Sequence, residues 1–292
     1  MKKSYIFAGI AIIGWSTLAP TTKLLVTDLP NMQVLFISSS IAFLSLLLFN
    51  CVRKNLRILR GYTFKDIATQ LALGVLGLFA YTALYNFGIE RLTSQDANII
   101  NYLWPLMIIL FSVPILKEKF SLRKLAAVSL SFFGLVIVAT GGNFSTIEMG
   151  NLPGIAACVG AAICFGLFSV VNKKKNYDQF IAMMLFFGVT AILSGIWFLI
   201  EGNYQPLTIA QVGGLLWLGI AANAVAYLAW ALALKVGDTA KISNLAYVIP
   251  FLAIVLSAVM LGENIYAYSV AGLLFIVLGI LCGELNFCAA KK

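Results

Sequence analysis

Aromatic and amide side chains recur at helical spacing inside strongly apolar stretches of this chain. Tyr81 and Tyr85 are four residues apart, and Asn98 and Asn101 are three apart, so each pair shares one face of a helix. A phenol or an amide that lies away from water needs a hydrogen-bond partner, which a polar cavity between helices can supply. Chemistry of this kind is the reversible binding of a solute, without bond making or breaking.

Rings and amides that fall near the middle of such apolar stretches therefore predict a binding cavity between helices. We assign to it the following residues: Trp15, Tyr81, Tyr85, Asn98, Asn101, Tyr102, Trp104, Tyr227, Trp230 and Tyr247. The alternative is that these groups only hold neighbouring helices together, because interhelical amide contacts are common in membranes.

The sequence offers little for covalent chemistry. The chain has no histidine, which excludes a histidine-based triad or zinc site, and its five cysteines form no Cys-x-x-Cys pair. No aspartate or glutamate falls at the centre of an apolar stretch, where ion-coupled carriers usually keep an ionisable group. We expect no enzyme activity, no metal and no cofactor. Facilitated export or exchange is favoured, although backbone carbonyls can also bind a coupling ion.

The elements that must position these residues are membrane helices. Hydrophobic residues make up 61% of the 292 residues, charged residues make up 11%, and the mean hydropathy is +0.97. The core of one soluble domain cannot bury so many apolar side chains. A crossing needs about 20 mostly apolar residues. Ten stretches meet this requirement, at 4–26, 31–50, 66–89, 94–115, 122–140, 152–173, 178–201, 210–234, 239–261 and 266–288.

The placement of lysine and arginine predicts that both termini are cytoplasmic. Of the 20 basic residues, 18 then lie on the cytoplasmic side, and only Lys23 and Arg91 lie outside. Cytoplasmic anchoring thus explains the net charge of +9, and we expect no binding of nucleic acid.

The two halves of the chain repeat with a displacement of 145 residues, which pairs Tyr102 with Tyr247, Pro105 with Pro250 and Glu118 with Glu263. An odd number of helices in each half turns the second half upside down in the membrane, an architecture of secondary carriers. We therefore predict an all-α membrane protein. Its ten transmembrane helices form two inverted five-helix repeats, 1–140 and 152–288, with alternating access around a site between them.

Pro105 and Pro250 fall at equivalent places within their predicted helices. A proline lacks the backbone N–H and frees a carbonyl about one turn earlier, so it kinks a helix. Such a kink is either a static feature held by packing or a hinge. The symmetric placement favours a hinge.

Three charged residues lie near predicted helix ends, and a glycine pair lies within the last predicted helix. Lys23 either reaches the surface with its ammonium group or holds a substrate carboxylate. Glu118 and Glu263 are expected to be end caps or gate partners. Gly279 and Gly283 form a Gly-x-x-x-Gly pair, which indicates only weakly a helix contact or a dimer.

The chain also resembles a known family. The motifs that carry the resemblance are Gly14-Trp15-Ser16-Thr17 ahead of Lys23, and Pro250 through Leu261-Gly262-Glu263 to Gly272 and Gly279. They are similar to the repeat motifs of the EamA-like branch of the drug/metabolite transporter superfamily. A narrower likeness to the YddG-type aromatic amino-acid exporters rests on Asn101-Tyr102-Leu103-Trp104-Pro105 and Tyr227-Leu228-Ala229-Trp230.

This resemblance implies a central cavity lined by aromatic side chains of the third, fourth and sixth helices. Carried over by position, it adds Phe165 to Tyr81, Tyr85, Tyr102 and Trp104. Phe165 stands where that branch tends to have tryptophan, which leaves the exact substrate open. An amino-acid zwitterion would meet the ring faces and the amides of the fourth helix.

We therefore predict a multi-pass carrier of the cell inner membrane that exports aromatic or neutral amino acids or related metabolites. Its expected partners are the small-molecule substrate and the lipid bilayer, and its expected state is a monomer or a weak dimer. The alternative on the same scaffold is an exporter of drugs or other small amphipathic metabolites.

Overall fold

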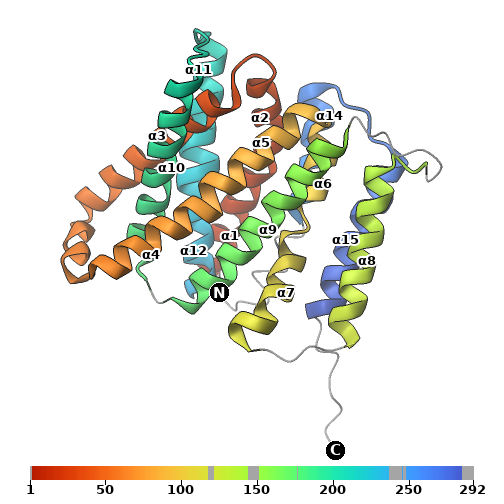
Figure 1. Ribbon diagram of the computed structural model, residues 1–292, viewed down its shortest axis with the longest axis horizontal. Coiled ribbons are helices and arrows are strands. Elements are labelled where there is room, and N and C mark those ends of the chain that lie inside the picture. Colours follow the sequence, from red (N-terminus) through yellow and green to blue (C-terminus); the bar gives the residue numbers. More distant parts are fainter. Residues whose placement is uncertain are drawn as a thin grey trace, which may run out of the picture.

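A computed structural model describes residues 2–117, 122–143, 151–175, 177–236, 245 and 248–284. Every regular element in these ranges is helical (Figure 1). The first half of the chain comprises α1 (Lys2–Ser16), α2 (Leu18–Val26), α3 (Asn31–Val52), the 3₁₀ helix η1 (Asn55–Gly61), α4 (Phe64–Gly74), the π-helix η2 (Val75–Ala80), α5 (Tyr81–Arg91), α6 (Ser94–Asn101), α7 (Trp104–Leu116) and α8 (Leu122–Ala139). The second half comprises α9 (Leu152–Lys174), α10 (Gln179–Glu201), α11 (Ile209–Leu216), the π-helix η4 (Trp217–Val225), α12 (Ala226–Val236), α14 (Val248–Leu261) and α15 (Ala267–Glu284).

Seven helical stretches among the described residues are long and apolar enough to cross a bilayer: Lys3–Val26, Asn31–Val52, Phe64–Arg91, Ser94–Ile115, Leu152–Asn172, Gln179–Glu201 and Ile209–Trp230. Three shorter apolar stretches follow the same pattern: Ser129–Val138, Val248–Leu261 and Ala267–Gly279. Each of these stretches falls within or overlaps one predicted crossing, so the expectation of an all-helical membrane protein is confirmed. The count of ten crossings and the cytoplasmic side of the termini stay predictions.

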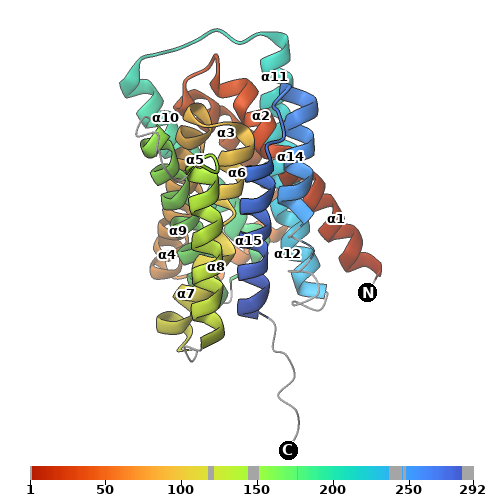
Figure 2. The same ribbon diagram turned by 90° about the vertical axis from the view of Figure 1, so that its right-hand side faces the viewer.

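Helices from the two halves of the chain pack side by side. α3 lies along α10, α1 lies along α12, and α8 lies along α15, while α9 packs between α5 and α7. The pair of α8 and α15 stands at the right-hand edge of Figure 1, and Figure 2 shows the same two helices side by side. The start of α1 and the end of α15 lie toward the same lower end of the molecule.

Several predicted crossings are not uniform α-helices. The first is interrupted at Thr17, whose hydroxyl donates to Gly14 O at 2.7 Å and accepts from Trp217 Nε1 at 2.7 Å. The third and eighth crossings each contain a π-helical segment, η2 and η4, which overlap when they are displaced by 145 residues. Segments with π geometry are frequent at functional sites.

The fourth crossing is broken between α6 and α7, at Tyr102 and Leu103. Pro105 is the second residue of α7, and Pro250 is the third residue of α14. Pro105 therefore stands in the first turn of α7, where a backbone N–H has no intrahelical partner to lose. The expectation of a kink inside a helix is corrected at this proline, and the interior proline of α7 is Pro114. Residues 246–247 lie outside the described residues, so the place of Pro250 within its helix stays a prediction.

Two glycines let α8 and α15 approach closely. A Cβ on Gly134 would come within 2.5 Å of Gly272 O, and a Cβ on Gly272 would come within 2.8 Å of Gly134 O. These contacts are with backbone atoms, which cannot turn aside as a flexible side chain can. One close approach of α15 thus lies at Gly272, about two turns before Gly279 and Gly283, whose contact stays a prediction.

We predict that Gly134→Ala lowers the thermal stability of the purified protein by several degrees. The added methyl group would overpack the contact between α8 and α15, which typically costs about 1–3 kcal/mol. The matched control is Gly213→Ala in α11, because a Cβ at Gly213 meets no atom within 4 Å. Melting of both variants in detergent, followed by size-exclusion chromatography, measures the difference. Equal melting temperatures would contradict this account of the contact.

Candidate functional site

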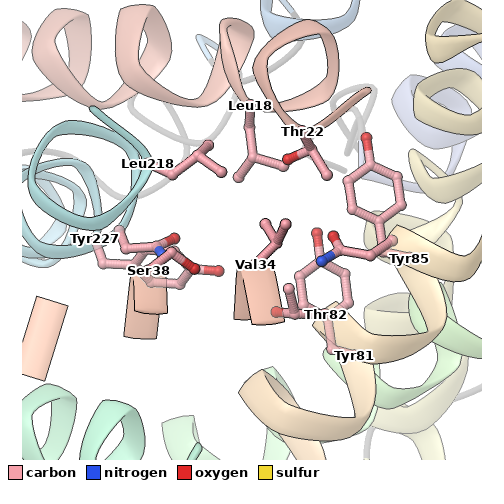
Figure 3. A pocket seen from close by; sticks show the side chains of 11 residues that line it. Leu18, Thr22, Val34, Ser38, Tyr81, Thr82, Tyr85, Leu218 and Tyr227 are labelled. Atoms are coloured by element: carbon pink, nitrogen blue, oxygen red, sulfur yellow. The ribbon is translucent and has the colours of Figure 1, made fainter. Parts of the chain in front are cut away.

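A cavity lies between α2, α3, α5, η4 and α12 (Figure 3). The residues that line it are Leu18, Thr22, Val34, Ser38, Tyr81, Thr82, Tyr85, Asn86, Leu218, Asn223 and Tyr227. In Figure 3 the side chains of Tyr81, Thr82 and Tyr85 lie on one side and those of Leu218 and Tyr227 on the other. The cavity volume is about 20 Å³, enough for a water molecule and too small for an amino acid.

Helix α5 supplies two adjacent stripes of this lining. Tyr81 and Tyr85 follow each other at i, i+4 with stacked rings, whose centroids are 6.0 Å apart at an interplanar angle of 12°. Thr82 and Asn86 follow at the same spacing, one residue further on. The π-helical segment η2 directly precedes Tyr81, and its extra residue per turn sets the direction in which the stripes face.

Two amides of α6 hold the tyrosines in place. Asn101 Nδ2 donates to Tyr81 Oη at 3.1 Å, and Tyr85 Oη donates to Asn98 Oδ1 at 3.3 Å. Both amides are buried, and Asn98 Nδ2 and Asn101 Oδ1 have no hydrogen-bond partner among the described residues. The amides thus hold the two tyrosines of the cavity wall, and each amide has one further polar atom that could bind a ligand or water.

The first group of aromatic rings lies on the α5 side of the cavity. The Tyr81 ring is 5.0 Å from the Phe165 ring, which is 5.3 Å from the Trp104 ring, and Tyr102 packs against Trp104 at 5.8 Å. Tyr85 completes this group through its stacking on Tyr81. The sixth predicted crossing therefore meets both the third and the fourth through aromatic contacts of Phe165.

The second group of rings lies on the α12 side. Trp15 is 5.2 Å from Tyr227 and 5.4 Å from Trp230, and Phe187 is 5.6 Å from Tyr227. Trp15 Nε1 is buried without a hydrogen-bond partner in the described structure. Tyr81 and Tyr227 both line the cavity, so the cavity separates the two ring groups.

The structure thus divides the predicted binding residues into three sets. Tyr81, Tyr85 and Tyr227 line the cavity. The other residues stand behind this lining, either in ring contact or hydrogen bond with it or one or two rings further back: Trp15, Asn98, Asn101, Tyr102, Trp104, Phe165 and Trp230. Tyr247 lies outside the described residues, as does Glu118.

Sequence reasoning missed several polar residues of the lining. Thr22, Ser38, Thr82 and Asn86 were not assigned to the site. Asn86 had a usable signal, because it is an amide in an apolar stretch beside the tyrosine stripe. Thr22 and Ser38 had none, because isolated hydroxyl residues are frequent in membrane helices, where they often bond to their own backbone.

No lining side chain carries a formal charge. Lys23 does not line the cavity, and its side chain is partly exposed. Its ammonium group donates to Ile89 O at 2.6 Å and to Leu92 O at 2.8 Å, at the C-terminal end of α5. A cation is favoured there because the last carbonyls of a helix are unsatisfied and carry partial negative charge. The cavity is therefore polar and aromatic, without a fixed charge.

We predict that Tyr85→Phe lowers the free energy of unfolding by about 1 kcal/mol. The substitution removes the donor to Asn98 and leaves that amide without a partner. The control is Tyr227→Phe, because the Tyr227 hydroxyl makes no hydrogen bond within the described residues. Melting curves of the two purified variants provide the comparison, and a larger loss for Tyr227→Phe would refute the assignment.

Comparisons with known proteins agree with this fold. The model of the EamA-like transporter family matches residues 2–140 and 152–282. A solved crystal structure superposes with a TM-score of 0.71 at 22% identity, covering 97% of both chains, and at that identity the likeness shows the fold alone.

Two curated relatives carry transporter names. An uncharacterized transporter of Clostridium kluyveri is 27% identical over 100% of this chain and 95% of its own length. The aromatic amino acid exporter YddG of Ancylobacter novellus is 27% identical over 64% of this chain and 65% of its own length. The family model covers most of the chain in two segments, and the helices it matches surround an uncharged cavity. This chain therefore belongs to the EamA-like transporter family, and it is a multi-pass membrane transporter rather than an enzyme.

Proposed function

We propose that this transporter is a secondary carrier that exports aromatic or neutral amino acids, or closely related metabolites, across the cell inner membrane. The observation that carries the proposal is the cavity, where aromatic rings and uncharged amides meet without a fixed charge. The relative named as an aromatic amino acid exporter supports both the substrate class and the direction.

The chemistry of the lining suits a zwitterion. Asn86 and Asn223 face the cavity from different helices, and an amide can donate to a carboxylate and accept from an ammonium group. The rings can add cation–π contacts with the ammonium group, each worth about 0.5–2 kcal/mol. A solute with net charge would enter without a counter-charge, and burying an unpaired charge is costly. The site therefore favours net-neutral solutes.

The small cavity indicates that helices must separate during transport. Pockets that enclose organic ligands usually have volumes of about 300–1,000 Å³, whereas this cavity has about 20 Å³. Alternating access provides the separation, first toward one side and then toward the other. The structure described above then corresponds to a closed state of the cycle.

The arrangement of helices supports two inverted repeats, 1–140 and 152–288. Under the 145-residue displacement, α3 and α10 are counterparts and pack together, and so are α8 and α15. The contact of α1 with α12 has its counterpart in the contact of α5 with α9. Such pairing is expected from a two-fold axis between the halves, which gives two states of similar energy. The carrier would act as a monomer or a weak dimer.

Counterflow into proteoliposomes tests the function. The purified protein should exchange labelled phenylalanine at least about tenfold faster than empty vesicles, and faster than it exchanges lysine or glutamate, because of the uncharged lining. We expect Asn86→Leu to abolish this flux while the protein still inserts. Absence of phenylalanine flux, together with flux of an amphipathic drug, would instead support the alternative exporter.

A second amide serves as the matched control for Asn86. Gln70 is fully buried on α4, has no hydrogen-bond partner in the described structure, and does not line the cavity. Gln70→Leu should keep most of the phenylalanine flux. Equal losses in the two variants would mean that any buried amide matters and that Asn86 has no special place.

We further propose that Pro105 and Pro250 mark hinges. Pro105 follows the break between α6 and α7, and a residue with an N–H there could bond to Asn101 O and join the two helices. Pro105→Ala should therefore slow counterflow by about tenfold without reducing the amount of folded protein. A parallel loss of flux and of folded protein would argue for a purely structural kink.

A further inference from the structure

The turn between α14 and α15 meets the start of α6 through a carboxylate. Glu263 Oε1 accepts from Ser94 N at 2.7 Å, and Glu263 Oε2 accepts from Gln95 N at 3.2 Å. The first backbone N–H groups of a helix have no partner within the helix, and they attract negative charge. A side chain of the second half of the chain thus caps a helix of the first half.

The side chains of Ser94, Gln95 and Asp96 make further contacts with the second half. Ser94 Oγ lies 3.0 Å from Ser257 Oγ of α14, and Gln95 Nε2 donates to Asn264 O at 3.3 Å. Asp96 Oδ1 accepts from the hydroxyl of Ser269 on α15, at 2.9 Å. All of these contacts are polar, so water can replace them when they separate.

Lys23 also lies near these contacts between the start of α6 and the second half, which we call the junction. It caps the end of α5 next to the start of α6, and its positive charge attracts the Glu263 carboxylate. The junction lies at the upper end of Figure 1, opposite the end where the chain begins. By the distribution of basic residues, this is the predicted outer end.

Helix α6 connects the junction to the cavity. Ser94 and Gln95, at its start, bind Glu263, while Asn98 and Asn101 further along hold the two cavity tyrosines. The helix has only eight residues and ends at the break before α7. A short rigid segment with a break at one end can swing as a unit. Such a swing would release the tyrosines from their amides.

We propose that α6 is the outer gate of this carrier and that the Glu263 carboxylate is the latch that keeps the gate closed. The proposal rests on the carrier function but not on the identity of the substrate. Opening breaks the polar contacts of residues 94–96 with α14, α15 and the turn between them. The amides of α6 then move away from Tyr81 and Tyr85, and the cavity becomes accessible from outside.

Accessibility of a cavity residue tests the latch directly. We would place a single cysteine at Thr82 in a background whose five cysteines are replaced by alanine. A membrane-impermeant maleimide added to whole cells should label it slowly while Glu263 is present. Glu263→Gln should raise the labelling rate about tenfold, because a charge-assisted hydrogen bond is roughly twice as strong as a neutral one. A rate within twofold of the parent would overturn the proposal.

The matched control is Glu90→Gln. Glu90 lies at the same end and carries the same charge, but its carboxylate pairs with Arg91 on the surface. Its labelling rate should equal that of the parent. If it rises as much as in Glu263→Gln, any charge at this end would matter and the latch would be refuted. The assay needs no substrate, so its result is independent of whether phenylalanine is transported.

A disulfide cross-link tests the movement of α6 without changing Glu263, and it applies even if the Glu263→Gln variant does not insert. The Ser94→Cys, Ser257→Cys double variant replaces two hydroxyls that are 3.0 Å apart and retains Glu263. Oxidation to a disulfide should lock the gate, so flux of the transported solute falls to background and returns after reduction with dithiothreitol. Full flux through the cross-linked protein would show that α6 need not move.

Discussion

A polar side chain in the hydrocarbon core of a bilayer must find its partner inside the protein. This constraint organises the centre of the molecule, where Asn98 and Asn101 of α6 meet Tyr85 and Tyr81 of α5. The two amides fix the positions of the Tyr81 and Tyr85 hydroxyls. The Tyr81 ring lies between the cavity and the Phe165 ring behind it. A cavity without a fixed charge results, and this property limits what the transporter can accept.

The same helix offers a physical basis for the proposed alternating access. The start of α6 binds the Glu263 carboxylate, and its Asn98 side chain accepts a hydrogen bond from the cavity residue Tyr85. The helix ends at the break before α7. We therefore expect that a displacement at one of these points also displaces the other two. The π-helical segments η2 and η4 directly precede the cavity tyrosines of α5 and α12, so irregular backbone adjoins the site from both halves of the chain.

Sequence patterns predicted the fold better than the site. Hydropathy located the seven long helical stretches to within a few residues, because a crossing requires a continuous apolar stretch. The interruption at Thr17 depends on an indole 200 residues away, and the π-helical segments have no sequence signature, so neither was predictable. The aromatic residues were found because rings at mid-depth are conspicuous. Ser38 and Thr22 were missed because their role arises only when α2 and α3 are brought together.

In the proposed carrier, a net-neutral amino acid occupies the space between the two ring groups. A structure determined with saturating phenylalanine would locate the ligand. We expect an enlarged cavity, with the ligand's carboxylate and ammonium groups within hydrogen-bond distance of Asn86 and Asn223. A ligand bound elsewhere, or a cavity that stays empty and unchanged at saturation, would contradict it.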